Sequence, residues 1–484
     1  MFTAETQIMV FSSSIFIFFF LPLVIIGYHL LKKNYRIYFL MLASLFFYAW
    51  GEPRYVLIML LSIAINYTFG LFIHSSISAQ KKILAKTFLI LSVACNLGIL
   101  FYFKYMDFTI NTINRAFHAD FALRNIVLPI GISFFTFQGM SYVIDLYWQK
   151  VSVQKNPGLL AFYISFFPQL IAGPIVRYID IEKQIYNRDE NIEKFISGAQ
   201  RFIAGLAKKL VIANNMGYVA DLVFANPAAE NTAIVAWFGI ICCTFQVYFD
   251  FSGYSDIAIG LGKMFGFEFM ENFNYPYISK TITEFWRRWH ISLSSWFMDY
   301  VYKPLGGSRK GNVYANLFIV FFLVGFWHGA SFTFIVFGLW HGLFLIIERL
   351  FKAGEVKNKI FVPLRYILTM LIVVIGFVFA KSPSMRYALS YLGIMFGIVK
   401  PENVIFTTRF YFNYGNIFML CLSAFASTPV MKQLYGFLKT RCSARAEYTV
   451  IYKSITFVLI FALFFFCIVI VTSTSYNPFI YFRF

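Results

Sequence analysis

Three of the six histidines in this chain, His290, His328 and His341, lie between residues 283 and 342. A neutral imidazole, with an ordinary pKa of about 6.5, can take a proton from a hydroxyl nucleophile near neutral pH. The same segment is rich in tryptophan and otherwise largely apolar. Titratable groups at bilayer depth are costly, so they mark functional sites by default. The sequence therefore predicts that residues 283–342 hold the reaction centre of a membrane-embedded enzyme.

His328 is the strongest catalytic candidate, because it follows Trp327 in the middle of an apolar run. A structural histidine with satisfied ring nitrogens would give the same pattern, so both interpretations stay open. His341 lies thirteen residues further along, about 20 Å away on a straight helix and on a different side of it. The two can approach one reacting atom only if glycines such as Gly325 and Gly338 fold the segment into a hairpin.

An amphipathic helix at the membrane interface is predicted over residues 284–296. Apolar residues recur there at i, i+4, i+8 and i+11, which is typical of one buried stripe. Glu284 precedes Arg287 and Arg288 by one helical turn, so it can pair with either. His290 lies beside the stripe. The stripe consists of Phe285, Trp289, Leu293 and Trp296.

Basic residues on and after this predicted helix form a positive face. Such a face suits an anionic ligand, for example a phosphate-bearing cofactor. Anionic lipid head groups would attract the same charges, and charge alone does not separate the two interpretations. The predicted cofactor-binding residues are Arg287, Arg288, Arg309 and Lys310, and Lys303 adds to the same face.

Asp250 and Asp256 lie in an apolar, glycine-rich segment, residues 248–267. An unpaired buried carboxylate is costly, so each is expected to have a cationic partner or to stay protonated. Arg287 or Arg288 is one predicted partner; a direct role in a central cavity is the alternative. The predicted supporting residues of the site are Trp327, Asp250, Asp256 and Asp299. No close His or Cys pair has ligand spacing, so no metal site is predicted.

The elements that must position these residues are membrane helices. Hydrophobic residues make up 60% of the chain and charged residues only 13%. Apolar runs of membrane-crossing length predict an all-α polytopic membrane protein with about eleven transmembrane helices, plus interfacial and re-entrant ones. The net charge of +19 is concentrated between these runs, which the positive-inside rule explains without any nucleic-acid partner. Segments 128–148 and 166–178 contain Pro and Gly, which predicts either kinked helices or broken ones that line a cavity.

The distribution of basic residues also predicts the sidedness of the chain. Lys32, Lys33 and Arg36 follow the first apolar run, so that run should end in the cytoplasm and the N-terminus should lie outside. A basic loop at residues 432–453 precedes the last apolar run, so the tail at residues 472–484 should also emerge outside.

Several long motifs in the same order resemble the bacterial polysaccharide-modifying branch of the membrane-bound O-acyltransferase family, of the alginate or peptidoglycan O-acetylation type. They include TEFWRRWHISLSSW (283–296), FWHGASFTFIVFGLWHG (326–342), YFDFSGYSDIAIGLGKMFGF (248–267) and the closing NPFIYFRF (477–484). The resemblance spans nearly the whole chain and implies a single domain, 1–484. MVFSS at Met9 resembles the start of that branch, so Met9 is an alternative initiator to Met1.

The resemblance implies transfer of acetyl from cytoplasmic acetyl-CoA across the bacterial inner membrane for O-acetylation of an envelope polysaccharide. It implies a ring of helices around a central channel, no bound cofactor, and an extracytoplasmic esterase-like partner that completes the transfer. His328 then corresponds to the catalytic membrane histidine and His290 to a second, cytoplasm-facing one. Tyr481 in the tail resembles a tyrosine proposed to carry the acyl group in related D-alanylation systems.

Two other classes of protein remain as alternatives. A transporter or flippase could carry an acylated or lipid-linked precursor without covalent chemistry, and inverted hydropathy repeats would favour it, but none is visible. A structural scaffold would need no intramembrane histidines. The sequence does not distinguish alginate-like polymers from peptidoglycan as the acceptor.

Overall fold

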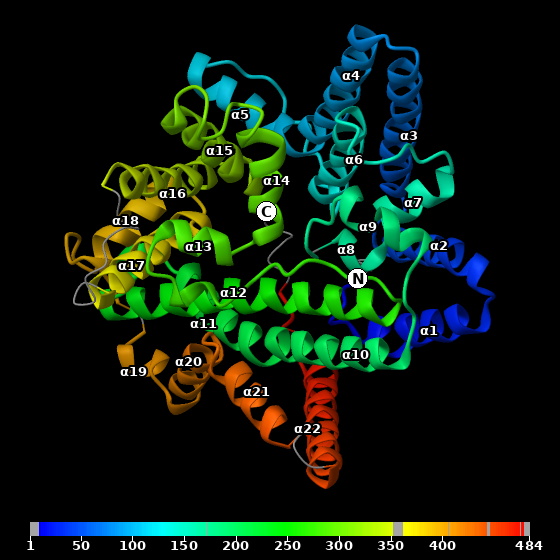
Figure 1. Cartoon of the computed structure of the whole chain (residues 1–484). Helices are drawn as coiled ribbons and strands as arrows, with labels where there is room; N and C mark the ends of the chain where they lie inside the picture. Colours follow the sequence, from blue (N-terminus) through cyan, green and yellow to red (C-terminus); the bar gives the residue numbers. More distant parts are fainter. Residues whose placement is uncertain are drawn as a thin grey trace, which may run out of the picture. The chain divides into compact units, whose positions relative to one another are not determined.

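The computed structural model describes residues 9–171, 173–351, 362–404, 406–442, 446–474 and 476–478 (Figure 1). All regular elements among the described residues are helices, which confirms the predicted class. The chain separates into two compact units, Met1–Phe202 with Ile257–Met270, and Ile203–Asp256 with Glu271–Phe484. The division passes through α10 (Ile192–Ala207) and α12 (Ala233–Met264). The single-domain assignment stays a prediction.

Within the described residues, six helices are long and apolar enough to cross a membrane, or seven if one bent pair counts as a span. The chain is therefore a multi-pass membrane protein, whereas the predicted number of about eleven spans is not confirmed. Several predicted spans form shorter helices, such as α6 (Ile132–Tyr147) and α18 (Met385–Met395). The six spans are Val56–Ser78, Lys82–Phe117, Ala233–Met264, Phe332–Leu350, Val362–Lys381 and Val450–Ser473.

In the first unit, α3 (Val56–Ser78) and α4 (Lys82–Leu100) are tied together by their side chains. Asn66 and Asn96 each donate to the other's amide oxygen, at 3.0 and 3.1 Å. Reciprocal bonds of this kind satisfy both buried amides in apolar surroundings. Of the two alternatives for residues 166–178, the helix is broken rather than kinked, since only the short helix α8 (Phe167–Leu170) forms before α9 (Tyr178–Tyr186).

A charged cluster in the first unit surrounds Glu190, whose carboxylate accepts a hydrogen bond from Tyr28 at 2.7 Å. Arg188 lies 2.8 Å from the same carboxylate, and Arg36 pairs with its other oxygen. Burial raises the pKa of Glu190, but the Tyr28 hydrogen bond and the two guanidinium charges outweigh it and hold the pKa below its ordinary value.

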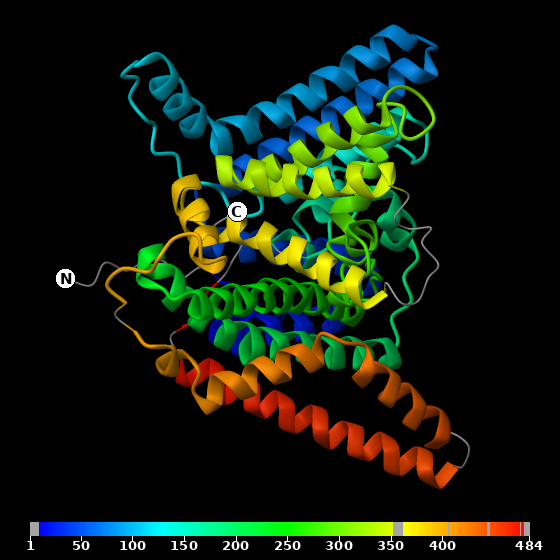
Figure 2. The same cartoon turned by 90° about the vertical axis from the view of Figure 1, so that its left-hand side faces the viewer.

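In the second unit, α15 (Val313–His328) and α16 (Phe332–Leu350) form a hairpin and lie side by side in Figure 2. The backbones meet at Gly325 and Gly338, where a Cβ on Gly338 would collide with the carbonyl oxygen of Phe321. The hairpin that was the condition for His328 and His341 to approach each other is therefore present. Other helices of this unit are α11 (Asn214–Ala225), α17 (Val362–Lys381), α20 (Tyr414–Ala426), α21 (Val430–Cys442) and α22 (Ala446–Ser473).

Two expected elements take a different form. The predicted helix 284–296 is two helices, α13 (Ile282–Arg288) and α14 (Ile291–Phe297), because His290 adopts a left-handed conformation (φ 44°, ψ 54°). The four stripe residues are nevertheless all buried. The glycine-rich segment 248–267 lies largely within α12, which runs unbroken to Met264, so Asp250 and Asp256 lie on a continuous helix.

Candidate functional site

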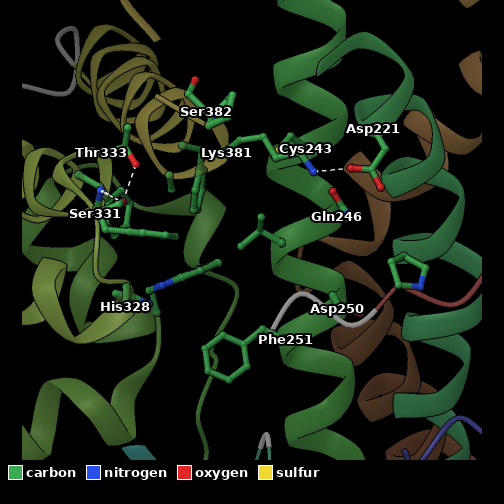
Figure 3. A pocket seen from close by; sticks show the side chains of 18 residues that line it. Asp221, Cys243, Gln246, Asp250, Phe251, His328, Ser331, Thr333, Lys381 and Ser382 are labelled. Carbon is green, nitrogen blue, oxygen red and sulfur yellow. Dashed lines mark hydrogen bonds and ion pairs between the residues drawn. The ribbon is translucent and has the colours of Figure 1, made fainter. Parts of the chain in front are cut away.

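The second unit encloses a cavity of about 360 Å³. Figure 3 shows His328 on one side and Gln246, Asp250 and Phe251 of α12 on the other. Most of its wall is apolar. The lining residues are Asp221, Cys243, Gln246, Val247, Asp250, Phe251, Trp289, His328, Ser331, Thr333, Phe334, Phe337, Phe377, Ala380, Lys381, Ser382, Pro383 and Pro478.

His328 reaches this cavity because it is the last residue of α15. The next helix starts only after Ser331, whose side chain accepts a hydrogen bond from the backbone N–H of Phe334. The imidazole therefore sits at a sharp turn, 8% exposed. The unpaired carbonyls at a helix C-terminus favour a nearby positive charge, and His328 lies at such a terminus.

His290 lies directly behind His328, with the two ring centroids 6.3 Å apart. It is fully buried and does not line the cavity. Its ring packs edge-on against Phe251, which does line the cavity, at a centroid distance of 4.4 Å. The left-handed backbone at His290 is uncommon outside glycine, and such strain persists where surrounding contacts impose it. The structure thus brings together the two predicted catalytic histidines.

Asn272 fixes the tautomer of His290. The amide oxygen of Asn272 accepts hydrogen bonds from the backbone N–H and the hydroxyl of Ser292, at 3.2 and 2.9 Å. A backbone N–H only donates, so the Asn272 atom that also faces Nδ1 of His290, at 3.2 Å, must be the oxygen. Nδ1 of His290 therefore carries the proton, and Nε2 keeps its lone pair.

The electrostatics of this site favour a neutral His290. Burial first, and then the nearby His328, hold the pKa of His290 well below its ordinary value. Among the residues that the structure describes, Nε2 of His290 has no hydrogen-bond partner. The lone pair of Nε2 is therefore available to accept a proton, and perturbed groups of this kind are common at functional sites.

Comparison with known proteins identifies the family. The model of the membrane-bound O-acyltransferase family matches residues 37–389, a stretch that contains both histidines. The chain belongs to this family. It is an O-acyltransferase, and its membrane helices agree with that assignment.

Three relatives show which branches of the family the acyltransferase resembles. It is 39% identical to "Probable alginate O-acetylase AlgI" of Pseudomonas putida, over 98% of this chain and 100% of the relative. It is 37% identical to a peptidoglycan O-acetyltransferase of Helicobacter pylori, over 81% and 80% of the two chains. It is 31% identical to a teichoic acid D-alanyltransferase of Bacillus subtilis, over 53% and 67%.

The third histidine of the acyltransferase has a different setting. His341 is fully buried within α16 and does not line the cavity. Its ring stacks on Phe285 at 5.9 Å and meets Trp286 and Phe337 edge-on at 5.4 and 5.0 Å. His341 is therefore enclosed by aromatic rings.

The acidic residues of α12 have partners other than those expected. Asp250 pairs with Lys209 at 2.6 Å, both fully buried, and Asp256 pairs with Lys208 at 2.6 Å. The predicted pairing with Arg287 or Arg288 is wrong, because the π-helical turn η3 (Lys208–Ala213) presents the two lysines to α12. Of the two carboxylates only Asp250 lines the cavity.

The predicted cofactor-binding residues lie away from the cavity. Arg287 is exposed, while Arg288 donates to Glu284 at 3.0 Å and to the carbonyl of Asn274 at 3.1 Å. The predicted Glu284 pair is thus confirmed for Arg288. Arg309 and Lys310 are exposed on the turn before α15.

The remaining predicted residues have distinct positions. Trp327 lies against both catalytic candidates, with ring centroids 5.8 Å from His290 and 5.0 Å from His328. Asp299 pairs with Lys303 away from the cavity. Tyr481 lies outside the described residues.

Sequence reasoning missed several polar residues of the site. Asp221 and Lys381 line the cavity and pair at 2.6 Å (Figure 3). Each is a charged residue within or at the end of an apolar helix, the same signal that drew attention to Asp250. Asn272 carried no such signal, because a lone amide in a loop has no distinctive spacing.

Proposed function

We propose that this protein transfers an acetyl group from acetyl-CoA for the O-acetylation of an envelope polysaccharide. The observation that carries the proposal is the pair of adjacent imidazoles, His290 and His328, at the wall of a cavity in an O-acyltransferase. The relatives named for alginate and peptidoglycan acetylation match most of the chain, whereas the D-alanyltransferase matches about half. This pattern favours an acetyl group and a polysaccharide acceptor.

In the proposed reaction, the oxygen of an acceptor hydroxyl attacks the thioester carbonyl of acetyl-CoA. His328 takes the proton from that hydroxyl as the attack proceeds. The new O–C bond forms, the C–S bond of acetyl-CoA breaks, and the proton passes from the imidazole to the leaving thiolate of CoA. Proton transfer by a positioned histidine contributes about 10²–10⁴-fold to rate. The apolar cavity excludes water, which limits hydrolysis of the acetyl group.

Donor and acceptor approach from opposite sides of the bacterial inner membrane in this proposal. The exposed cations Arg287, Arg309 and Lys310 face the cytoplasm and attract the phosphates of acetyl-CoA, and both chain termini lie outside. Tyr481 in the outer tail is the first acyl acceptor, and an extracytoplasmic esterase-like partner passes the acetyl group to the polymer. Membership of an acyltransferase family supports this scheme over a transporter without covalent chemistry.

The test is incubation of the purified protein with labelled acetyl-CoA, followed by mass spectrometry for covalent acetyl and by measurement of released CoA. Acetyl on Tyr481 in the wild type, absent from His328→Ala and Tyr481→Phe, is the expected result. CoA release that depends on His328 but not on Tyr481 would support the acetyltransferase activity and exclude Tyr481 as the first acyl acceptor. Release that is unchanged in His328→Ala, also with the partner present, would overturn the proposal.

A further inference from the structure

We propose that residues 476–478 dock on one face of η3 and α11, with Pro478 in the wall of the cavity, and that this docking anchors the acceptor arm of the enzyme. The inference rests on the proposed function and adds to it the residues that place the arm. We call the receiving residues, Lys209, Asn214, Tyr218 and Asp221, the tail dock. Asn214, Tyr218 and Asp221 follow one another at intervals of four and three residues, so they share one face of α11. Lys209 precedes them by five residues within the π-helical turn η3, whose wider turn brings it close to the same face.

Tyr476 makes the side-chain contacts of the docked segment. Its hydroxyl donates to Oδ2 of Asp221 at 2.7 Å, while Oδ1 of Asp221 accepts from Lys381 at 2.6 Å. Its ring packs edge-on against Tyr218 at a centroid distance of 5.6 Å. A hydrogen bond to a charged group is worth about 1.5–3 kcal/mol. Lys381 holds the Asp221 carboxylate in position, so the phenol meets a fixed acceptor.

The backbone of the segment is held at two further points. Asn214 donates its amide to the carbonyl of Tyr476 at 3.3 Å, and Lys209 donates to the carbonyl of Pro478. Lys209 is also the buried partner of Asp250, which lines the cavity. Pro478 lines the same cavity. Pro478, the last residue of the docked segment, is therefore part of the cavity wall.

The helix that precedes the segment provides little support of its own. Only 6% of the most apolar window of Val450–Ser473 is buried within the protein, against 22–72% in the other five spans. Apolar packing of this helix therefore contributes little to where the segment after it lies. The polar contacts of the tail dock determine that position, which explains why charged and amide side chains are placed along an otherwise apolar helix.

The tail dock is tested with full-length protein in detergent or nanodiscs, using Tyr476→Phe, which removes one hydroxyl, and Asp221→Asn. Tyr414→Phe is the matched control, because Tyr414 is 95% exposed and lies on α20. The first measurement is amide hydrogen exchange of the C-terminal peptide. The second is the ratio of protein-bound acetyl to released CoA after addition of acetyl-CoA. His328→Ala is run alongside.

We expect exchange of the C-terminal peptide to rise about tenfold or more in both dock variants but not in Tyr414→Phe. The acetyl-to-CoA ratio should fall, because acetyl no longer meets a positioned acceptor. Exchange that matches the control, with CoA release still dependent on His328, would overturn the dock and leave the proposed function standing. Faster exchange with an unchanged ratio would overturn the role as acceptor arm. Faster exchange of the C-terminal peptide in the dock variants, together with unchanged CoA release in His328→Ala, would support the docking contacts and overturn the proposed function.

Discussion

His328 and His341 lie on the two helices of one hairpin, yet their surroundings differ in every respect that matters for chemistry. His328 ends its helix, lines a cavity and has a second imidazole 6.3 Å away. His341 lies inside its helix, enclosed by Phe285, Trp286 and Phe337. Among the described residues, neither ring nitrogen of His341 has a hydrogen-bond partner. Burial of a histidine in a membrane protein therefore does not by itself indicate catalysis; access to a cavity and a proton-transfer partner do.

Of the substitutions that test this comparison, the largest loss of activity is expected at His290, which lies beside His328 and does not line the cavity. His290→Ala should lower acetyl transfer by about 10²–10⁴-fold, because the adjacent proton acceptor is lost. Steady-state CoA release measures this, with circular dichroism to confirm that the helices persist. Activity within a few-fold of wild type would mean that His328 acts alone.

A second prediction concerns the pH dependence that Asn272 imposes. Burial holds the pKa of His290 below its ordinary value, so the neutral form persists into acidic solution. Asn272→Asp places a carboxylate beside Nδ1, which favours the imidazolium and raises the pKa of His290. The acid limb of the pH–rate profile should therefore move to higher pH. Ser255→Ala, which removes only the acceptor of the Asn272 amide N–H, is the control. An acid limb that stays in place would exclude Asn272 as a positioning residue.

A third prediction tests the hairpin that carries both histidines. Gly338→Ala should destabilise the fold by about 1–3 kcal/mol, because the new methyl group collides with the backbone of α15. Gly98→Ala in α4 is the matched control, since an added Cβ there meets nothing within 4 Å. That change should be neutral or slightly stabilising. Thermal unfolding in detergent compares them; equal midpoints would show that the close contact is not needed.

The smallest expected effect is on the pH dependence of stability, which is measured separately from the pH dependence of activity at the histidines. The pKa of Glu190 is depressed in the folded protein, so its contribution to stability is present above the ordinary carboxyl pKa. That contribution is lost as the pH falls through the ordinary value, about 4.3, toward the depressed one. Glu190→Gln should flatten the dependence of the unfolding temperature on pH in this range, whereas exposed Glu402→Gln should not. If the unfolding temperature depended on pH equally in both variants, Glu190 would not be the source of this acid sensitivity.

Composition and apolar periodicity predicted the helical class, and motif order predicted the membrane-bound O-acyltransferase family. These features depend on local pattern or on residues close together in sequence. The left-handed break at His290 was not predicted, because the local stripe at helical spacing indicated one helix. The contact of His290 with Asn272 joins residues 18 positions apart and leaves no pattern in the local sequence.

The partner of Asp250 was missed for a similar reason. The arginines of residues 283–296 were the cations nearest to the predicted site, while the actual partner, Lys209, comes from a π-helical turn earlier in the chain. The glycines of the same helix, α12, serve its packing: a Cβ on Gly253 would lie 2.9 Å from the carbonyl oxygen of Gly205.

The most direct test of the central claim measures CoA release from acetyl-CoA by His328→Ala and His341→Phe side by side. His328→Ala should lose about 10²-fold or more of the activity. His341→Phe should keep activity close to wild type and fold at least as well, because an aromatic ring replaces an imidazole whose nitrogens are unsatisfied. The reverse outcome, an active His328→Ala and an inactive but folded His341→Phe, would place the reaction centre elsewhere in the hairpin and contradict this account.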